Sequence, residues 1–317
     1  MCFQSLSHHC LAVCATCFAL LFSATFVGIG HAEGALIAFK ESKYNNIYIY
    51  KRGPLITLTF GHNRRFYTET IYDTRDEKAL PVPYTRYMTL ALPYAPKLSS
   101  ILEIGFGGGR TARYLNLHLP KTQIKSVELD PQVVELAKKY FGIKDSENFA
   151  IKVKDGRRYL IQSSQKWDVI MIDAYRGPFV PFHLLTKEFF QLAKSRLSEN
   201  GIVVQNIEPT TMMFDSALAT ISSVFDHVDL YQSAGNVVAV AYNGKQREHK
   251  ELATQATTLQ SKHNFKYNLV NMLQDRRIFT KTKDGKILTD DFAPVESLLA
   301  IKRHNKKLDD LSVTATK

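Results

Sequence analysis

The chain has 317 residues, of which 45% are hydrophobic and 22% charged. This composition excludes a wholly disordered chain, a collagen-like chain and a polytopic membrane protein, and the length is sufficient for one large domain or two small ones. The net charge of +11 favours anionic partners and disfavours a free cationic substrate.

An apolar leader precedes the body of the chain. The first basic residue is Lys40, and the segment from Leu11 to Ile29 is almost wholly apolar or small. The small residues Gly30 and Ala32 favour a signal peptide that is cleaved before Glu33. An uncleaved membrane anchor and a mis-assigned start are the alternatives. We therefore expect residues 1–32 to export the protein, or to anchor it with the main domain on the cytoplasmic side.

All four cysteines lie in this leader, at positions 2, 10, 14 and 17. The body of the chain therefore cannot hold a disulfide framework, a cysteine metal site or a thiol nucleophile. The ten histidines show no metal-ligand spacing, so the sequence predicts no metal cofactor.

Residues 33–83 read as a small N-terminal β-strand domain. Alternating segments at 47–50, 55–60 and 66–72 are separated by glycine-containing breaks, which predicts strands joined by hairpins. Residues 84–92 then show helical spacing of apolar groups and lead toward a proline.

Residues 84–301 contain strands that alternate with helices. Strands are predicted at 101–104, 124–129, 149–153, 167–172 and 202–207, with helices at 110–118, 131–140 and 186–197. The segments 228–231 and 237–241 predict a terminal antiparallel hairpin, and 245–280 reads as helical and polar. This order implies a Rossmann-like α/β fold, in which a mostly parallel sheet has helices on both faces. A charged tail, residues 302–317, ends the chain.

A glycine-rich turn follows the first strand of this larger domain, in Glu103-Ile104-Gly105-Phe106-Gly107-Gly108-Gly109-Arg110. Glycines let the backbone turn tightly and approach a ligand, and the start of the next helix offers free N–H groups. Arg110 stands where the dinucleotide fingerprint has its last glycine. The pattern therefore favours a nucleoside with a charged amino-acid tail over NAD, and a purely structural turn is the alternative.

Acidic residues end the next strands of the predicted sheet. Glu128 is placed to accept hydrogen bonds from ribose hydroxyls, and Asp155, with Gly156 beside it, to accept an adenine amino group. Asp155 could equally cap a helix. Asp173 ends the fourth strand. Because ligands of doubly wound sheets bind outside the carboxyl ends of the strands, these residues together predict one nucleoside site.

The segments ILEIGFGGGRTARYL, SVELDPQVVELAKKYFG, KDGRRYL and WDVIMIDAY resemble the spermidine synthase family of polyamine aminopropyltransferases, which has the class I S-adenosylmethionine-dependent methyltransferase fold. The resemblance covers about residues 43–207. The later segment LTDDFAP, residues 288–294, is similar to the ending of spermidine-synthase-like bacterial proteins.

The resemblance implies roles for particular residues of this chain. The methionine tail of S-adenosylmethionine, or of its decarboxylated form, would lie along Gly105, Gly107 and Gly109. Glu128 would hold the ribose and Asp155 the adenine. Asp173 would take the position of the catalytic carboxylate, with Tyr84 as the tyrosine that precedes the nucleotide domain. Tyr175 and Arg176 would contact the acceptor.

The chain departs from the family pattern at the acceptor end. Gly108 and Arg176 stand where family members have aspartates, and Thr85 stands where they have His or Gln. Fewer carboxylates and an added guanidinium predict a poor pocket for a polycation, because like charges repel. Glu103, by contrast, restores the acid that methyltransferases carry before the glycines.

Two further features have alternative readings. His183 is either a base near the cleft or, more in keeping with its loop, a hydrogen-bonding residue. Asp290 and Asp291 either approach the acceptor pocket or simply turn the chain, and the turn is favoured.

We expect a transferase that moves an aminopropyl group from decarboxylated S-adenosylmethionine to an amine, with Asp173 and Tyr84 orienting and deprotonating that amine. The alternatives are an S-adenosylmethionine-dependent methyltransferase with a non-polyamine acceptor and a non-catalytic nucleoside-binding protein. Carboxylates around the acceptor pocket would favour the first. The expected partner is a small-molecule acceptor such as a polyamine, and no nucleic acid is expected. A homodimer and membrane association through the leader stay open.

Overall fold

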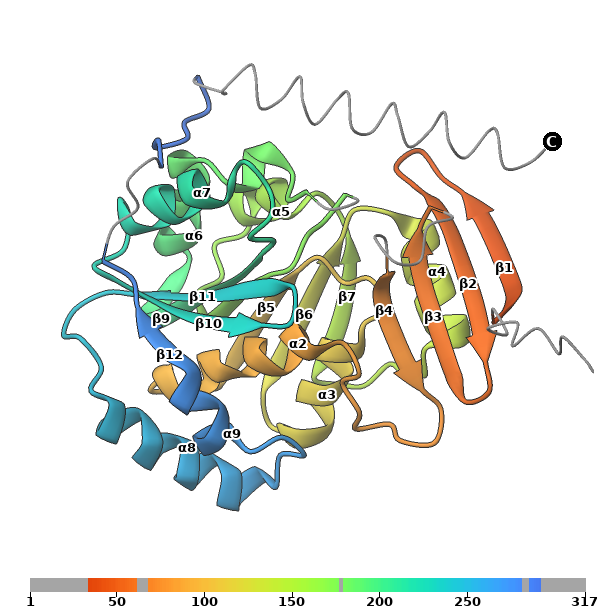
Figure 1. Cartoon of the computed structure of the whole chain (residues 1–317), viewed down its shortest axis with the longest axis horizontal. Coiled ribbons are helices and arrows are strands. Elements are labelled where there is room, and N and C mark those ends of the chain that lie inside the picture. Colours follow the sequence, from red (N-terminus) through yellow and green to blue (C-terminus); the bar gives the residue numbers. More distant parts are fainter. Residues whose placement is uncertain (1–33, 62–67, 177–178, 281–284, 292–317) are drawn as a thin grey trace, which may run out of the picture. The chain divides into compact units, whose positions relative to one another are not determined.

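The computed structural model describes residues 34–61, 68–176, 179–280 and 285–291, which form two sheets with their helices (Figure 1). The predicted leader and the charged tail lie outside the described residues. Within the described ranges, no helix has the length and apolar character needed to cross a membrane.

The smaller sheet is an antiparallel meander in chain order, with the strands β1 (Ala35–Glu41), β2 (Asn46–Arg52), β3 (Leu55–Phe60) and β4 (Thr68–Asp73). The turn between β2 and β3 requires a left-handed residue, which Gly53 supplies at φ 56°. Ile49 lies opposite Leu58, and both are fully buried. The hairpins expected from the alternating segments are thus present, and β1 is an additional strand.

The larger sheet has the order β12-β10-β11-β9-β8-β5-β6-β7. Its parallel strands are β5 (Ser100–Ile104), β6 (Gln123–Glu128), β7 (Phe149–Val153), β8 (Trp167–Ile172) and β9 (Leu197–Ile207). The antiparallel edge consists of β10 (His227–Ser233), β11 (Asn236–Tyr242) and β12 (Arg276–Ile278). The predicted α/β fold class is confirmed.

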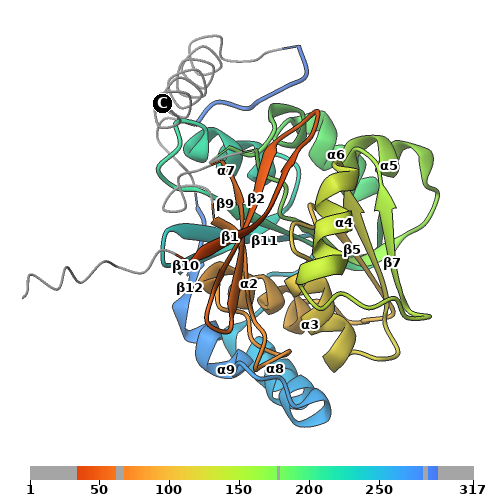
Figure 2. The same cartoon turned by 90° about the vertical axis from the view of Figure 1, so that its right-hand side faces the viewer.

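Helices cover both faces of this sheet, as the alternation of the strand residues requires. Val169 and Met171 belong to a core with α2 (Pro83–Met88), η1 (Thr89–Tyr94), α3 (Arg110–His118), α4 (Pro131–Tyr140), α8 (His249–His263) and α9 (Leu269–Met272). Ile170 and Ile172 belong to a second core with α5 (Gly156–Gln162), α6 (Lys187–Ser195) and α7 (Phe214–Ser222). Figure 2 shows the smaller sheet in red and orange, nearest the viewer.

Local caps set the helix starts on which the site depends. The Asp130 carboxylate accepts a hydrogen bond from the Gln132 amide at 2.9 Å, and Pro131 occupies the first helical turn of α4. The predicted helix over 84–92 is instead divided into α2 and the 3₁₀ helix η1. Pro93 lies inside η1, and a proline ring disfavours a continuous α-helix.

A buried ion pair attaches the last strand to the sheet. Arg276 Nη2 lies 2.6 Å from Asp229 Oδ2, and both side chains are almost wholly buried. Tyr94 donates to the same carboxylate at 2.8 Å. This network stabilises β12. The prediction of a helix throughout residues 245–280 is therefore wrong at its end, where the short η3 (Leu273–Asp275) and β12 lie.

Candidate active site

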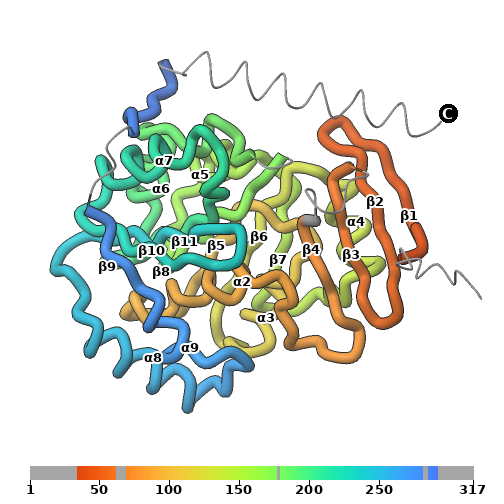
Figure 3. The backbone as a smooth tube through the Cα atoms, in the orientation of Figure 1, coloured from red at the N-terminus to blue at the C-terminus, as the bar shows by residue number. Residues whose placement is uncertain are grey.

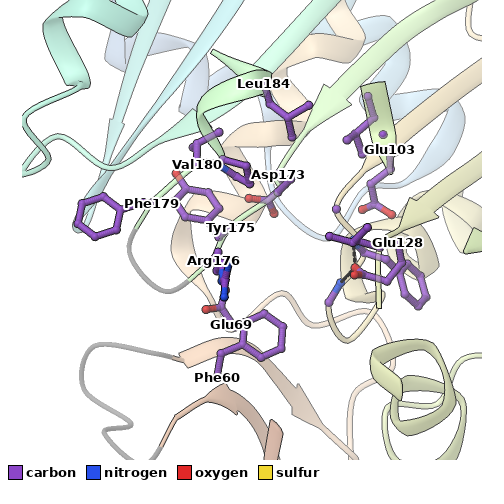
Figure 4. Close-up of a pocket in the computed structure, with 18 of the residues that line it drawn as sticks. Phe60, Glu69, Glu103, Glu128, Asp173, Tyr175, Arg176, Phe179, Val180 and Leu184 are labelled. Carbon is purple, nitrogen blue, oxygen red and sulfur yellow. Dashed lines mark hydrogen bonds between the residues drawn. The ribbon is translucent and has the colours of Figure 1, made fainter. Parts of the chain in front are cut away.

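A cavity of about 540 Å³ lies at the carboxyl ends of β5, β6 and β8, with β4 of the smaller sheet on its other side. This is the edge where doubly wound sheets bind ligands. Figure 4 shows that side chains from several separate segments converge on it.

The glycine-rich turn forms one wall of the cavity. Gly105 has φ 91°, and a Cβ there would lie 2.2 Å from the backbone oxygen of Asp173, so no side chain fits. Gly107, at φ 52°, also lines the cavity. Gly109 is buried behind the turn at the start of α3, where a Cβ would meet Phe106 at 2.2 Å. Of the three glycines expected along the methionine tail, Gly105 and Gly107 therefore line the cavity, whereas Gly109 does not and instead allows close packing.

Glu128 ends β6 and holds the glycine-rich turn in place. Its Oε2 accepts hydrogen bonds from the amides of Phe106 at 3.0 Å and Gly107 at 3.3 Å, while Oε1 accepts from the Asp130 amide at 3.0 Å. Burial raises the pKa of Glu128, and these three amides oppose the rise. The carboxylate therefore lies on the cavity wall in a fixed orientation, as the predicted ribose acceptor would have to.

Glu103 lies deeper in the same wall and is 3% exposed. The Ser126 hydroxyl donates to its Oε2 at 2.5 Å. Burial, aided by the charges of Asp173 and Glu128, raises the pKa of Glu103 to about 8. At neutral pH this group is therefore mostly a neutral acid, which can donate as well as accept a hydrogen bond.

Asp155 caps a helix, which is one of the two roles that the sequence left open to it, and it also lines the cavity. Its Oδ1 accepts from the Arg158 amide at 2.8 Å at the start of α5. Its Oδ2 lies 2.9 Å from His183 Nε2, and this hydrogen bond lowers the pKa of Asp155. Gly156 follows, and a Cβ there would lie 2.2 Å from Ile104, so glycine allows α5 to begin close against β5.

Asp173 follows β8 and is held at both carboxylate oxygens. Asn206 Nδ2 donates to Oδ1 at 2.9 Å, and Tyr84 Oη donates to Oδ2 at 3.2 Å. Burial raises the pKa of Asp173 to about 6, against the effect of these two donors. Burial and the charge of Asp173 hold the pKa of Tyr84 well above its usual range, so the phenol keeps its proton and donates it. Asp173 thus combines a fixed orientation with a pKa suited to accepting a proton near neutrality.

Glu69 is an acidic residue of the cavity that sequence reasoning missed. In the pairing of β3 with β4, Leu58 lies opposite Thr70 and Thr59 opposite Thr68, so Glu69 is the extra residue of a β-bulge. Bulges re-aim a side chain, and this one lies among the residues that line the cavity (Figure 4). Burial, followed by the charges of Asp173 and Glu128, raises the pKa of Glu69 well above its usual range.

Residues after β8 and β9 line the same cavity beyond Asp173. Tyr175 Oη donates to the Asn206 carbonyl at 2.9 Å, and Glu208 also lines the cavity. Arg176 lines it too, but its side chain is exposed, and its backbone pairs with Phe179. The expectation of a cavity poor in carboxylates here is therefore wrong, because Glu69 and Glu208 line it together with Asp173.

The two other departures have structural reasons. The surroundings of Gly108 disfavour the aspartate of the family, because a Cβ would lie 2.5 Å from Thr70 Cγ2, and its amide donates to Thr70 Oγ1 at 2.9 Å. Thr85 is buried and donates to the Val82 carbonyl at 2.6 Å. Both positions stabilise the packing around α2 and β4 of this chain.

Asn206 was not predicted as a site residue, although the sequence around it is unusual for a buried strand. It follows Gln205 in the otherwise apolar strand segment IVVQNI, and both side chains are buried. A polar pair near the carboxyl end of a buried parallel strand indicates a site, since burial of a polar group without a function or partner is costly. Glu69 had no such signal, because its orientation depends on the bulge.

Comparisons with known proteins agree with this geometry. The sequence profile of the Spermine/spermidine synthase domain matches residues 83–237. A polyamine aminopropyltransferase from Vibrio vulnificus is 30% identical over 278 residues, which cover 84% of this chain and 92% of that protein.

Solved structures show the same fold. A probable spermidine synthase from Corynebacterium glutamicum has a TM-score of 0.65 at 18% identity and covers 82% of this chain and 98% of its own. The spermidine synthase from Thermotoga maritima has a TM-score of 0.61 at 23% identity and covers 76% of this chain and 83% of its own.

The sheet order, the two helix layers and the glycine-rich turn define a Rossmann-like protein of the class I methyltransferase type. Within this fold class, the sequence identity to the Vibrio enzyme over most of both chains identifies the family. The chain belongs to the spermine/spermidine synthase family, and it is a transferase. The resemblance seen in the sequence motifs is confirmed.

Proposed function

We propose that this protein transfers an aminopropyl group from decarboxylated S-adenosylmethionine to an amine, as a polyamine aminopropyltransferase does. The observation that carries the proposal is the arrangement of Asp173. Its carboxylate is fixed by Tyr84 and Asn206 and shares one cavity with Glu69. Such a cavity suits a cationic acceptor that must be deprotonated before it reacts.

The donor end of the cavity fits an adenosyl substrate. Gly105 and Gly107 present backbone without side chains, Glu128 is held as an acceptor on the adjacent wall, and Asp155 and Gly156 lie at the start of α5. These groups would hold the tail, ribose and base in turn. Glu103 lies beneath the turn, where a neutral acid can hydrogen-bond the tail.

The proposed reaction is a nucleophilic substitution at carbon. The amine nitrogen attacks the propyl carbon bonded to the sulfonium, the C–N bond forms as the C–S bond breaks, and the sulfur keeps the electron pair as a neutral thioether. The amine loses one proton, which Asp173 accepts and then releases to water. Because the sulfonium is already a good leaving group, the residues of this chain contribute mainly by orienting the amine and removing its proton.

Charge at the acceptor end supports a cationic amine. The pKa values of Asp173 and Glu69 are raised by burial, and the charge of Asp173 contributes to the rise at Glu69, so the ionised pair is unfavourable without a cation. An ammonium group between them would relieve that cost. The guanidinium of Arg176 is exposed, and solvent screens it.

The test resolves the products of purified full-length protein incubated with putrescine and either decarboxylated or intact S-adenosylmethionine. Methylthioadenosine together with an aminopropylated amine supports the proposal. S-adenosylhomocysteine together with a methylated acceptor would instead establish methyl transfer, and binding of methylthioadenosine without turnover of either donor would contradict aminopropyl transfer to putrescine. Asp173→Asn should lower kcat by about 100-fold or more. The control Asp145→Asn, which removes an exposed ion pair with Lys138, should leave kcat unchanged.

We also propose that residues 1–32 act as a signal peptide or membrane anchor, on the ground of the apolar segment Leu11–Ile29. The N-terminal sequence of the protein recovered from each cell fraction tests this. An N-terminus at Glu33 in an exported fraction supports cleavage, and an intact leader in the membrane fraction supports an anchor. Recovery of the intact chain from the soluble cytosol would contradict both.

A further inference from the structure

We propose that residues 285–291 position the wall of the cavity at its nucleoside end, through an ion pair between Asp290 and Arg157. The inference rests on the proposed function, because that function places an adenosyl group at this end. Asp290 is not among the described residues that line the cavity, so its effect on a ligand has to pass through other residues.

The segment is anchored on α6 and α7. Leu288 is fully buried, and its amide donates to Thr220 Oγ1 at 2.9 Å while its carbonyl accepts from the Lys187 amide at 2.8 Å. The Asp290 amide donates to Glu188 Oε2 at 2.9 Å. Figure 3 shows this segment, in deep blue, beside these helices and far in sequence from the strands that form the site.

Asp290 and Arg157 form a two-pronged ion pair. Arg157 Nη1 donates to Oδ1 at 2.7 Å, and Nη2 donates to Oδ2. The pair raises the pKa of Arg157 and lowers that of Asp290. A bidentate pair fixes the plane of the guanidinium as well as its position, and the Arg157 side chain is 19% exposed, so the orientation is well defined.

Arg157 connects this pair to the cavity wall. The same Nη1 donates to the His183 carbonyl at 3.1 Å and contacts Thr186 Oγ1 at 3.4 Å. His183 Nε2 in turn lies 2.9 Å from Asp155 Oδ2. Arg157 therefore holds the backbone of the wall segment, Pro181 to Leu185, whose residues line the cavity.

Asp290 and Arg157 are thus positioning residues. Neutralising Asp290 leaves the Arg157 guanidinium without its fixed partner, and the wall segment then loses the donor to the His183 carbonyl. The side chain of His183, and with it the orientation of Asp155, becomes less restricted. Binding of a ligand that contacts Asp155 must then also order this side chain, which costs conformational entropy and lowers the affinity.

The test compares Asp290→Asn with the control Asp291→Asn, which removes the same charge one residue further along. We expect the affinity for methylthioadenosine, measured by calorimetry, to fall about 3- to 10-fold in Asp290→Asn alone, since a partly exposed pair is worth less than a buried one. The melting temperature and the KM for the amine should not change. The charge exchange Arg157→Asp with Asp290→Arg should not recover the affinity, because an aspartate at position 157 cannot donate to the His183 carbonyl.

Hydrogen exchange gives a second readout that needs no ligand. The amides of Leu184 and Leu185 donate to the carbonyls of Pro181 and Phe182, both at 2.9 Å. Their exchange should quicken in Asp290→Asn and not in Asp291→Asn. Unchanged affinity and exchange in Asp290→Asn, or equal losses in both variants, would overturn the inference. If the unmodified protein does not bind methylthioadenosine, the proposed function fails, and the affinity measurement can no longer test the inference. The hydrogen-exchange rates of Leu184 and Leu185 then still decide whether residues 285–291 position the wall segment.

Discussion

Removing the amide of Asn206 should shift the proton affinity of the proposed catalytic carboxylate. Asn206 Nδ2 donates to Asp173 at 2.9 Å and opposes the burial that raises the pKa of Asp173 to about 6. A hydrogen bond to a charged group contributes about 1.5–3 kcal/mol, and 1.36 kcal/mol corresponds to about one pKa unit. Asn206→Leu should therefore raise the pKa of Asp173 by about 1–2 units.

The consequence for activity is a shift of the acidic limb of the pH profile. Asp173 must be ionised to accept a proton, so the limb of kcat/KM should move upward by about 1–2 pH units in Asn206→Leu. A ¹³C-carboxyl NMR titration reports the same pKa without substrate. The matched control is Gln205→Leu, because Gln205 is a buried amide on the same strand whose side-chain atoms have no hydrogen-bond partner within the described part of the chain.

Gln205→Leu should leave the acidic limb in place. A limb that stays unchanged in Asn206→Leu, or moves to lower pH, would refute the assignment of Asn206 as a donor that favours the ionised form of Asp173. Equal shifts in both variants would show that the effect comes from the strand and not from this hydrogen bond.

Three further changes test other parts of the site. Burial raises the pKa of Glu103 from 4.5 to about 8, so the unmodified protein should lose stability as pH rises through that window. Between pH 6 and pH 9 this loss amounts to at most about 3 kcal/mol, and Glu103→Gln should lack it. Urea unfolding at pH 6 and pH 9 measures the difference, and an equal change of stability in both proteins would contradict the assignment. Gly108→Asp should lower the free energy of unfolding by about 1–3 kcal/mol, because its Cβ would lie 2.5 Å from Thr70 Cγ2, and a thermal melt that does not change would show that the turn has room. Glu128→Ala should weaken methylthioadenosine binding by about 1–3 kcal/mol in calorimetry, and unchanged affinity in a folded variant would remove the ribose assignment.

The arrangement of the residues at the proposed nucleoside end was predictable because its signals are local. A glycine-rich turn between a strand and a helix, and an acid at the end of the next strand, are read from a few adjacent residues. Asp130-Pro131 marks the start of α4 in the same way, and the cap is present. The sheet edge then brings Glu128 and Asp173 together without any further information.

The acceptor half was not predictable, because it depends on register and on distant contacts. Glu69 reaches the cavity through a bulge, and no pattern in β4 marks the extra residue. At the other end of the cavity, the pairing of Arg157 with Asp290 also had no local signal, because it joins positions 133 residues apart. The sequence shows that the family's aspartates are missing at positions 108 and 176. It does not show that Glu69, from β4 of the smaller sheet, supplies a carboxylate to the same cavity.

The bulge in β4 also makes the two ends of the cavity separable for protein engineering. Glu69 lines the cavity with the acceptor-end residues, while its neighbour Thr70 touches the glycine-rich turn through Gly108. Under the proposed function, we expect a library that varies position 69 to alter the preference for the acceptor while Thr70 keeps the glycine-rich turn in place. Deleting one residue here would remove the bulge and with it the extra residue that reaches the cavity, so we expect the strand to tolerate a change of identity at position 69 but no change of length.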